Sequence, residues 1–396
     1  MKIAIDCRTI LNPGYGEAAG VGHYTTFILH EMLRLDTENQ YVLFFGKNIA
    51  QAAVDDFIAG RSNVELRRFP FYSFRKAFPV VYSHAFLAHA VSKEKPDVFF
   101  APAGFPPMFY RGRSVITVHD LAIFRHPEWF PESMIGRTYS KSLLVPRSLR
   151  AASKIIVPSS ATANDIKLLF RYAHDKTVIV PHGVIRRDQF EHVLTDSMRN
   201  KFDLHGRYLL SLCTIEPRKN IESAVRAFDR WLIKTPALAK RHTFAVVGKK
   251  GWKYESVFKA INEVNSRWQK YAGRDVVKYL GYVTRKEKWA LLTNAHAFVY
   301  PSKYEGFGLP VLEAMSVGTP VITSRLTSLP EVGGDAVLYI NPDDPGPMVN
   351  LFDRLLDEDF RSKIAGLGLE RARQFTWERS AQKTLEVISR VGFAGE

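Results

Sequence analysis

The sequence predicts an α/β protein made of two doubly wound domains, each built on a parallel sheet. Short apolar runs rich in β-branched residues recur along the 396 residues, and helical patterns separate them. Most of these runs are continuously apolar rather than alternating, which is typical of parallel strands covered on both faces. The strand–helix alternation occurs once in each half of the chain and therefore indicates two domains.

The elements can be assigned in order along the chain. Strands are expected at residues 2–5, 41–45, 64–69, 97–101, 114–118, 154–157 and 177–180, and then at 208–213, 243–247, 276–280, 297–300, 320–323 and 336–340. Helical patterns cover residues 221–233 and 287–292, and Thr376 caps a last helix over 376–391. The polar stretch 185–204 has no strand signal and marks a boundary. We expect a first domain over 1–190, a second over 191–375, and a C-terminal segment over 376–396.

Composition narrows the class of protein. Lys and Arg number 55 against 40 Asp and Glu, a net charge of +15, which calls for an anionic substrate, membrane surface or nucleic acid. The 49 aromatic residues (27 Phe, 16 Tyr, 6 Trp) argue against disorder. Two cysteines exclude a disulfide scaffold and suit a reducing compartment. Because we find neither a signal-peptide pattern nor an apolar run of about 20 residues, we expect a cytoplasmic protein.

The most informative motif follows the expected strand 297–300. Gly306 and Gly308 let the backbone approach a ligand, and Pro310 suits the first turn of the next helix. Strand, glycine loop and helix start together form a phosphate-binding arrangement. Glu313 suits ribose hydroxyls, whereas a plain strand-to-helix turn would explain the glycines but not glutamates at both ends of the loop, Glu305 and Glu313.

A second motif, Glu216-Pro-Arg-Lys-Asn, follows the expected strand 208–213. Arg218 and Lys219 would face the ligand-binding edge of an open sheet and could neutralise a departing diphosphate. A solvated helix start is the alternative, but cations are unfavourable beside the positive end of a helix.

At this point the chain resembles the retaining, nucleotide-sugar-dependent glycosyltransferases of family 4, over nearly its whole length. The most specific element is Glu305-x7-Glu313, within the run Tyr-Glu-Gly-Phe-Gly-Leu-Pro-Val-Leu-Glu-Ala. Further support comes from Glu-Pro-Arg-Lys-Asn at 216–220, Leu-Gly-Tyr-Val at 280–283, Gly-Thr-Pro-Val-Ile at 318–322, Gly-Val-Gly-His-Tyr-Thr at 20–25, Val-His-Asp-Leu at 118–121 and Val-Pro-His-Gly-Val at 180–184. The resemblance implies the GT-B fold, in which two Rossmann-like domains face a cleft and the C-terminal helix crosses back to the first domain.

The resemblance also implies roles for individual residues. Arg218 and Lys219 would hold the donor diphosphate, Glu313 the ribose, and Glu305 the donor sugar. His119 would lie beside the reacting sugar. The remaining donor-binding positions would be the backbone of Gly306, Phe307, Gly308 and Leu309, the first-domain loop with Gly20 and Gly22, and Tyr282 and Val283 near the base.

One departure from the family pattern concerns the diphosphate. Many members place Gly-Arg-Leu after the strand entering the lysine motif, but this chain has Cys213, Thr214 and Ile215, so Arg218 and Lys219 would carry the charge alone. The subgroup with Glu-Pro-Arg-Lys-Asn and His-Pro-Glu (126–128) is rich in mannosyltransferases of surface polysaccharides. GDP-mannose is therefore the favoured donor, with a glycan or lipid-linked saccharide as acceptor and no cofactor.

No metal site is expected. The acidic run 357–359 matches an Asp-x-Asp pattern, but it follows a helical pattern without a preceding strand and indicates a solvated helix end. His119 has a simpler alternative as well, since a histidine at a strand end can serve only as a cap.

The segment from Arg61 to Phe78 interleaves five cations with five aromatic residues and contains one acid, Glu65. The segments from Phe105 to Arg113 and from Arg137 to Lys154 have a similar character. Cations beside aromatics suit an anionic membrane, a lipid-linked acceptor or single-stranded nucleic acid, although a core-packed loop remains an alternative. We expect peripheral docking on the inner face of a membrane and regard nucleic acid as the weakest partner.

Three other function classes remain open. A nucleotide-sugar epimerase or a phosphorylase could use the same fold, although no lysine is singled out for a phosphorylase cofactor. A non-enzymatic sugar-binding protein is usually exported. A nucleic-acid binder is suggested only by charge and aromatics.

Overall fold

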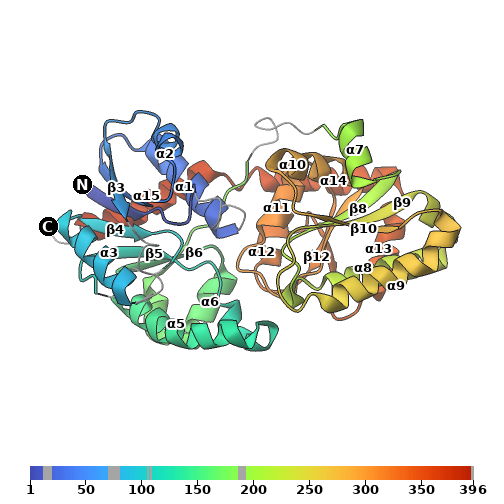
Figure 1. Ribbon diagram of the computed structural model, residues 1–396, viewed down its shortest axis with the longest axis horizontal. Helices are drawn as coiled ribbons and strands as arrows, with labels where there is room; N and C mark the ends of the chain where they lie inside the picture. The colour runs from blue at the N-terminus through green and yellow to red at the C-terminus, as the bar shows by residue number, and fades with distance from the viewer. Residues whose placement is uncertain (12–19, 70–80, 105–106, 108, 186–192, 394–396) are drawn as a thin grey trace. The chain divides into compact units, whose positions relative to one another are not determined.

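The computed structural model describes residues 1–11, 20–69, 81–104, 107, 109–185 and 193–393. The chain divides into two compact units (Figure 1). Unit 1 contains Met1–Leu121, Ser133–Gly183 and Thr376–Glu396, and unit 2 contains Ala122–Glu132 and Val184–Phe375.

In the described part of unit 1, a seven-stranded sheet has the order β3-β2-β1-β4-β5-β6-β7, with every neighbouring pair parallel. Its strands are β1 Lys2–Asp6, β2 Gln40–Gly46, β3 Val64–Phe69, β4 Val98–Ala101, β5 Ser114–Thr117, β6 Lys154–Val157 and β7 Thr177–Ile179. Around it lie α1 Gly20–Leu35, α2 Gln51–Ile58, α3 Val81–Lys93, α5 Glu132–Ala151, α6 Ser160–Leu169, the 3₁₀ turn η2 Arg171–Lys176 and α15 Trp377–Phe393.

Unit 2 holds a six-stranded parallel sheet in its described residues, with the order β10-β9-β8-β11-β12-β13. The strands are β8 Arg207–Leu212, β9 His242–Val247, β10 Val277–Gly281, β11 Ala297–Tyr300, β12 Val321–Ser324 and β13 Leu338–Ile340. Its helices are α4 Ala122–Arg125, α7 Asp196–Phe202, α8 Ile221–Lys234, α9 Glu255–Ala272, α10 Arg285–Asn294, α11 Leu309–Ser316, α12 Leu329–Gly333, α13 Gly346–Arg354 and α14 Glu358–Ala372, with 3₁₀ turns η1 Pro127–Trp129, η4 Pro217–Lys219 and η5 Pro236–Lys240.

These sheets confirm the predicted fold class of two Rossmann-like α/β domains. Each expected strand is present, and the observed ends differ from the expected ones by at most two residues. The strand order in unit 2 changes direction at β8, with β9 on one side and β11 on the other. Ligands of open α/β sheets bind at the carboxyl ends of the strands beside such a switch point.

The contacts differ from two expectations about domain boundaries. Ala122–Glu132 falls inside the expected first domain, 1–190, but it belongs to unit 2 because it packs there. The indole of Trp252 donates to the carbonyl of Trp129 (2.9 Å), and Lys253 donates to the carbonyl of Glu128 (2.7 Å). The division expected between residues 190 and 191 falls after Gly183, next to the polar stretch 185–204, which contains no strand but holds helix α7, capped by Thr195 through the amide of Met198.

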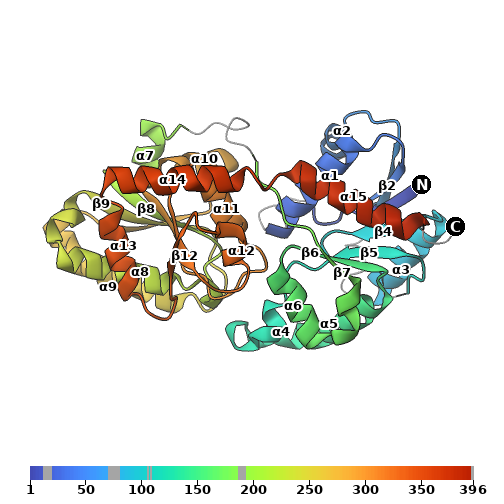
Figure 2. The ribbon, with the colours of Figure 1, turned by 180° about the vertical axis from the view of Figure 1, so that it is seen from behind.

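Helix α15 belongs to unit 1 and packs along α1, as both ribbon views show (Figure 2). The ring of Trp377 stacks on Phe27, with centroids 5.4 Å apart, and Ser380 donates to the carbonyl of Pro181 (2.6 Å). The last helix of the chain therefore completes the unit in which the chain begins.

Candidate functional site

The loops that follow β8, β9 and β11 meet at the carboxyl edge of the sheet in unit 2. The amide of Gly251, after β9, donates to the carbonyl of Ile215, after β8 (3.0 Å). The amide of Lys303, after β11, donates to the carbonyl of Arg218 (2.7 Å). The two motifs that the sequence singled out therefore lie side by side, at the edge where such sheets bind ligands.

Lys219 and Glu305 form a buried ion pair within these loops. Lys219 Nζ also donates to the hydroxyl of Tyr300 (2.7 Å). Glu305 Oε1 accepts two further hydrogen bonds, from Tyr300 (2.8 Å) and from Ser302 Oγ (2.7 Å). Three donors therefore hold one carboxylate oxygen, and this orients the whole group.

Arg218 lies beside this pair and has an acidic partner of its own. Its Nε donates to Glu216 Oε1, and its Nη1 lies 3.4 Å from Glu305 Oε2. Lys219, Arg218, Glu216 and Glu305 together carry two positive and two negative charges. The sequence assigned both cations to a diphosphate but did not show that two glutamates neutralise them.

The ionisation of this cluster follows from its contacts. Burial alone would raise the pKa of Glu305, but the charges of Lys219 and then Arg218 outweigh it and lower the pKa to about 2. Burial, together with the nearby Glu305, raises the pKa of Tyr300 well above its usual value. At neutral pH Glu305 is therefore a carboxylate, and Tyr300 keeps its proton to donate.

The loop after Glu305 is held by two hydroxyl side chains that the sequence analysis missed. The amide of Glu305 donates to Thr327 Oγ1 (2.9 Å). Ser328 Oγ donates to the carbonyls of Glu305 (2.9 Å) and Phe307 (2.8 Å). The stretch after strand β12 contains both hydroxyl residues and could have suggested hydrogen bonds. Thr327 lies 22 residues beyond Glu305 in the sequence, however, so their contact could not be predicted.

Gly308 turns this loop into helix α11. Its φ of 106° belongs to the region that favours glycine, and a Cβ there would lie 2.8 Å from a methyl of Leu329. Helix α11 begins at Leu309, and Pro310 occupies its first turn as predicted. The loop of Gly306, Phe307 and Gly308 therefore leads directly into the positive end of a helix.

Glu313 lies one turn further along α11 and has a cationic partner. Lys288 Nζ, on α10, is 2.5 Å from Glu313 Oε1. The sequence predicted a carboxylate pointing toward the ligand but gave no sign of this lysine. Its ammonium fixes the carboxylate from the side of α10.

Tyr282 and Val283 follow strand β10 at the same edge of the sheet. Val283 is buried, whereas Tyr282 is 62% exposed. Lys249, after β9, lies 5.0 Å from the centre of the Tyr282 ring. An exposed aromatic ring with a cation over one face lies at the position that the resemblance assigns to the base.

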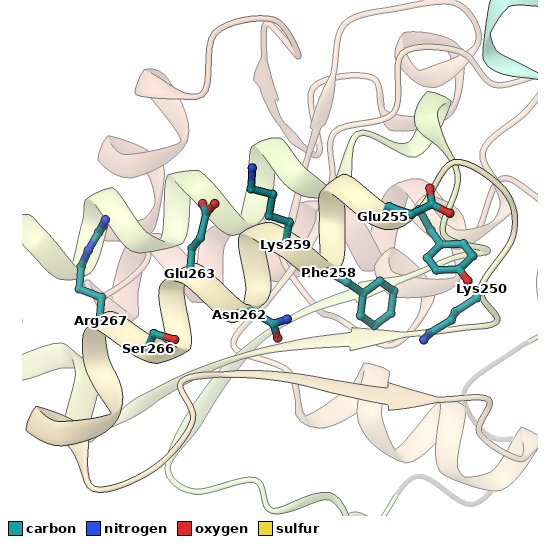
Figure 3. A pocket seen from close by; sticks show the side chains of 9 residues that line it. Lys250, Glu255, Phe258, Lys259, Asn262, Glu263, Ser266 and Arg267 are labelled. Atoms are coloured by element: carbon teal, nitrogen blue, oxygen red, sulfur yellow. The ribbon is translucent and has the colours of Figure 1, made fainter.

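A groove of about 860 Å³ lies along helix α9 of unit 2 (Figure 3). It is lined by Lys250, Tyr254, Glu255, Phe258, Lys259, Asn262, Glu263, Ser266 and Arg267. These residues include none of the predicted site residues, although Lys250 belongs to the loop after β9 described above.

In unit 1, the half-buried His119 packs against buried aromatic side chains at the end of β5. Its ring centre lies 4.7 Å from that of Tyr24 and 5.6 Å from that of His182. Its Nε2 donates to the carbonyl of Pro102 (2.8 Å). Burial lowers the pKa of His119, and even more that of His182, so both imidazoles are neutral at neutral pH. The sequence pointed to His119 but not to Tyr24 or His182 as its neighbours.

Gly20 and Gly22 do not form the loop that was expected. Both lie in the first turn of helix α1, where Gly22 is buried and Gly20 is exposed. In the next turn, Thr25 Oγ1 donates to the carbonyl of Val21 (2.9 Å).

The described part of the segment from Arg61 to Phe78 ends at Phe69, and residues 70–78 lie outside the described residues. Within the described part, Arg67 pairs with Glu65 and Glu94. Arg61 and Arg68 donate to backbone carbonyls. These three cations are therefore engaged within the protein.

Among the described residues, no helix is both long enough and apolar enough to cross a membrane. No group of three or more His, Cys, Asp or Glu side chains there is placed to hold a metal ion. The acidic run 357–359 starts helix α14, where Asp357 caps the helix by accepting the amide of Phe360.

Comparison with known proteins gives the family. The model described as "Glycosyl transferases group 1" matches residues 195–374, and "Glycosyltransferase Family 4" matches residues 18–186. The chain is 35% identical over 305 residues to O-antigen chain mannosyltransferase B of Escherichia coli, which covers 75% of each chain. It is 27% identical over 229 residues to O-antigen chain mannosyltransferase RfbU of Salmonella typhimurium, covering 58% of this chain and 57% of that one.

Among solved structures, sucrose-phosphate synthase from Thermosynechococcus elongatus aligns with a TM-score of 0.72 at 19% identity and covers 100% of both chains. Anabaena HepE in complex with UDP and glucose aligns with a TM-score of 0.70 at 18% identity, covering 98% of this chain and 99% of that one. These two structures share the fold. Both family models and the 35% identical relative place the chain in one family: it belongs to the group 1 and family 4 glycosyltransferases.

Proposed function

We propose that this glycosyltransferase moves mannose from GDP-mannose to a glycan or lipid-linked saccharide with retention of configuration, in the synthesis of a cell-surface polysaccharide. Relatives named as mannosyltransferases of O-antigen chains support the sugar and the pathway class. The observation that carries the site assignment is the cluster of Arg218, Lys219 and Glu305, oriented by Tyr300 and Ser302 at the carboxyl edge of the sheet.

In this proposal, Glu305 binds the donor sugar through Oε2. Its Oε1 already accepts from Lys219, Tyr300 and Ser302, whereas Oε2 receives a longer contact from Arg218. A carboxylate oxygen can accept about two hydrogen bonds, so Oε2 has capacity for a sugar hydroxyl. Such a carboxylate is a hydrogen-bond acceptor rather than a nucleophile, because its charge is already shared with two cations.

The diphosphate is assigned to Lys219, Arg218 and the start of helix α11. Lys219 has three N–H donors, and the structure gives acceptors to two of them, on Glu305 and Tyr300. The third can reach a phosphate oxygen. Because negative charge grows on the diphosphate as the sugar leaves, these donors stabilise the transition state more than the bound donor.

The remaining assignments complete the donor site. Glu313, fixed by Lys288, takes the ribose hydroxyls, and Tyr282 with Val283 lies against the base. His119 stands beside the reacting sugar, and Gly20 and Gly22 contribute at the start of α1. No cofactor or metal ion is required in this scheme, since side chains and a helix end supply the positive charge.

The proposed reaction is a front-face displacement. The acceptor hydroxyl forms its bond to the anomeric carbon on the face from which the diphosphate departs. A phosphate oxygen of the departing group takes the hydroxyl proton, so the products are mannosylated acceptor and protonated GDP. This route retains the configuration without a covalent enzyme intermediate.

Donor choice is tested by thermal shifts of the purified protein with GDP-mannose, UDP-glucose and ADP-glucose. A ligand at about 100 times its Kd stabilises the native state by about 2.7 kcal/mol, and at equal concentrations the ligand with the lowest Kd stabilises it most. GDP-mannose should therefore give the largest increase in melting temperature. Glu305→Gln should weaken this shift, whereas Asp343→Asn, which changes an exposed carboxylate paired with Lys303, should leave it unchanged. A larger shift with UDP- or ADP-glucose would overturn the GDP-mannose assignment.

Product analysis separates the transferase from its rivals. With acceptor present, NMR of the new linkage should show the same anomeric configuration as the donor. With donor alone, an epimerised sugar would identify an epimerase instead. Binding of the sugar with no product under either condition would identify a non-enzymatic sugar-binding protein.

A further inference from the structure

One surface of unit 1 combines strongly exposed apolar side chains with cations. Leu143 is 79% exposed and Leu168 is 68% exposed. Leu169 and Tyr172, which follow Leu168 closely in the sequence, are exposed as well. Single exposed leucines are common on proteins, but a group of them rimmed by charge marks an interaction site. We call this the basic apolar surface, made of Leu143, Arg147, Arg150, Lys167, Leu168, Leu169, Arg171 and Tyr172.

The residues of the basic apolar surface come from two neighbouring crossovers. Strands β5, β6 and β7 are consecutive neighbours in the sheet, so right-handed crossovers place α5 and α6 on the same face. Both ribbon views show the two helices side by side (Figures 1 and 2). The turn η2 follows α6 directly, so its side chains extend the same face.

Turn η2 is fixed to the C-terminal half of α5. The hydroxyl of Tyr172 donates to the carbonyl of Pro146 (2.7 Å), and the guanidinium of Arg150 lies 4.6 Å from the centre of its ring. Lys176 donates to the carbonyl of Ala152 (3.0 Å). Tyr172 therefore connects the apolar side chains of α6 and η2 with the cations of α5.

On α5 the exposed residues form one stripe. Leu143, Arg147 and Arg150 follow one another at spacings of four and three, which places them on one helical face. Val145 and Leu149 between them are buried. The stripe therefore faces outward while the other side of α5 packs on the sheet.

The charge of this region is one-sided. The sequence contains no Asp or Glu between Glu132 and Asp165, and Asp165 is buried. Asp175 is the exposed acid on η2. Arginines and lysines around exposed leucines and a tyrosine are typical of surfaces that lie in the headgroup region of anionic bilayers.

We propose that the basic apolar surface docks unit 1 on a membrane containing anionic phospholipids. Leucines can enter the boundary of the acyl chains while the arginines contact phosphate groups. A nucleic acid would offer phosphates to the arginines but no counterpart for the exposed leucines. The described cations of the segment from Arg61 to Phe78 are engaged within the protein, so this surface is a better candidate than that segment.

Vesicle sedimentation tests the proposal without donor or acceptor, so its outcome is separate from that of the proposed transfer reaction. The full chain should sediment with vesicles of phosphatidylcholine containing about 30% phosphatidylglycerol and remain in solution with phosphatidylcholine alone. A variant with Leu143→Ser, Leu168→Ser, Arg147→Glu and Arg171→Glu should bind the anionic vesicles at least about tenfold more weakly, since each cation near an anionic surface contributes about 1 kcal/mol.

A matched control carries the same kinds of change on exposed positions of unit 2: Ile233→Ser, Leu367→Ser, Arg230→Glu and Lys363→Glu. It should sediment like the parent protein. A charge-only variant, Arg147→Gln with Arg171→Gln, gives a milder test should the fourfold variant unfold, and it should lose binding with an unchanged melting temperature. Equal sedimentation of the parent with both vesicle types, or undiminished binding by the folded variants, would overturn the proposal.

Discussion

Glu305 keeps its negative charge inside unit 2 because Lys219, Tyr300 and Ser302 all donate to one of its oxygens. Removing one partner of a buried ion pair leaves the other charge uncompensated and costs about 3–5 kcal/mol. Removing both charges avoids most of that cost. The stability of this pair and its chemical use can therefore be measured separately.

The first prediction concerns this separation. Lys219→Met should lower the free energy of unfolding by about 3–5 kcal/mol at pH 7, because the buried Glu305 loses its close cation and keeps Arg218, 3.4 Å away, as its charged partner. The double variant Lys219→Met with Glu305→Gln should recover most of this stability. Transfer should be lost in both variants, since the donor contacts are missing in each. Urea unfolding and a transfer assay on the same preparations measure the two effects.

Lys303→Met provides the control, because Lys303 lies in the loop of Glu305 but pairs with the exposed Asp343 after β13. An exposed pair contributes about 0–1 kcal/mol, so this variant should unfold much like the parent protein. Equal destabilisation by Lys219→Met and Lys303→Met would contradict the buried pair. Full transfer by the double variant would contradict the proposed site.

At the residue scale the sequence identified members of the site but not their partners. Arg218, Lys219 and Glu305 stood out because cations and a glutamate beside a glycine loop have no simple structural reason. Their contact was not visible, because Lys219 and Glu305 are 86 residues apart and meet only through the pairing of β8 with β11. No recognisable sequence motif contains Lys288, Thr327 or Ser328. Their contacts with Glu313 and Glu305 are therefore visible only in the folded structure.

At the scale of elements, buried parallel strands were predictable because continuous apolar runs have few other uses. The start of helix α1 was not, since the glycines at 20 and 22 suggest a loop, whereas both lie in the first turn of the helix. The same holds for Ala122–Glu132, whose place in unit 2 depends on contacts with Trp252 and Lys253. Local patterns therefore gave the type of element more readily than its ends and its neighbours.

Two histidines at the starts of β9 and β11, the two strands that flank β8, make unit 2 sensitive to acid. His242 begins β9 and His296 immediately precedes β11, and their rings lie 6.1 Å apart. Burial is the main cause that lowers the pKa of each from 6.5 to about 4. The native state therefore binds fewer protons than the unfolded state between these values, so stability falls as pH falls through this window.

The corresponding prediction uses the pH dependence of unfolding. Replacing His242 with Phe should change the slope of the unfolding free energy against pH between about 6.5 and 4, with the variant losing less stability on acidification than the parent. Denaturant titrations at several pH values give these slopes, and identical slopes for parent and His242→Phe would exclude the histidine as the cause.

At the scale of the whole molecule, two of the points where the chain passes between the units lie together. The chain leaves unit 1 after Gly183 and returns at Thr376, and the amide of Val184 donates to the carbonyl of Phe375 (3.2 Å). Within unit 1, Gly183 fits against the start of α15. A Cβ on Gly183 would lie 2.1 Å from the backbone nitrogen of Trp377.

This close approach predicts that Gly183→Ala displaces the start of α15 from unit 1. The contacts at risk include the stacking of Trp377 on Phe27 and the hydrogen bond from Ser380 to the carbonyl of Pro181. Overpacking of this kind costs about 1–3 kcal/mol. Hydrogen exchange should show faster exchange in α1 and α15, with the helices of unit 2 unchanged, and calorimetry should show a lower melting temperature for unit 1.

Gly366→Ala is the matched control, because a Cβ at that position in α14 meets nothing within 4 Å. Alanine in an open helical position should stabilise the protein by about 0.5–1 kcal/mol, since it lowers the entropy of the unfolded chain. The two identical substitutions should therefore have opposite signs. If Gly183→Ala were neutral or stabilising, the close contact between the crossing segment and α15 would not constrain the molecule in solution. Gly183 is also the last residue of unit 1 before the chain enters unit 2. If Gly183→Ala lowered the stability but left the exchange protection of α15 unchanged, the strain would lie in the segment after Gly183 instead.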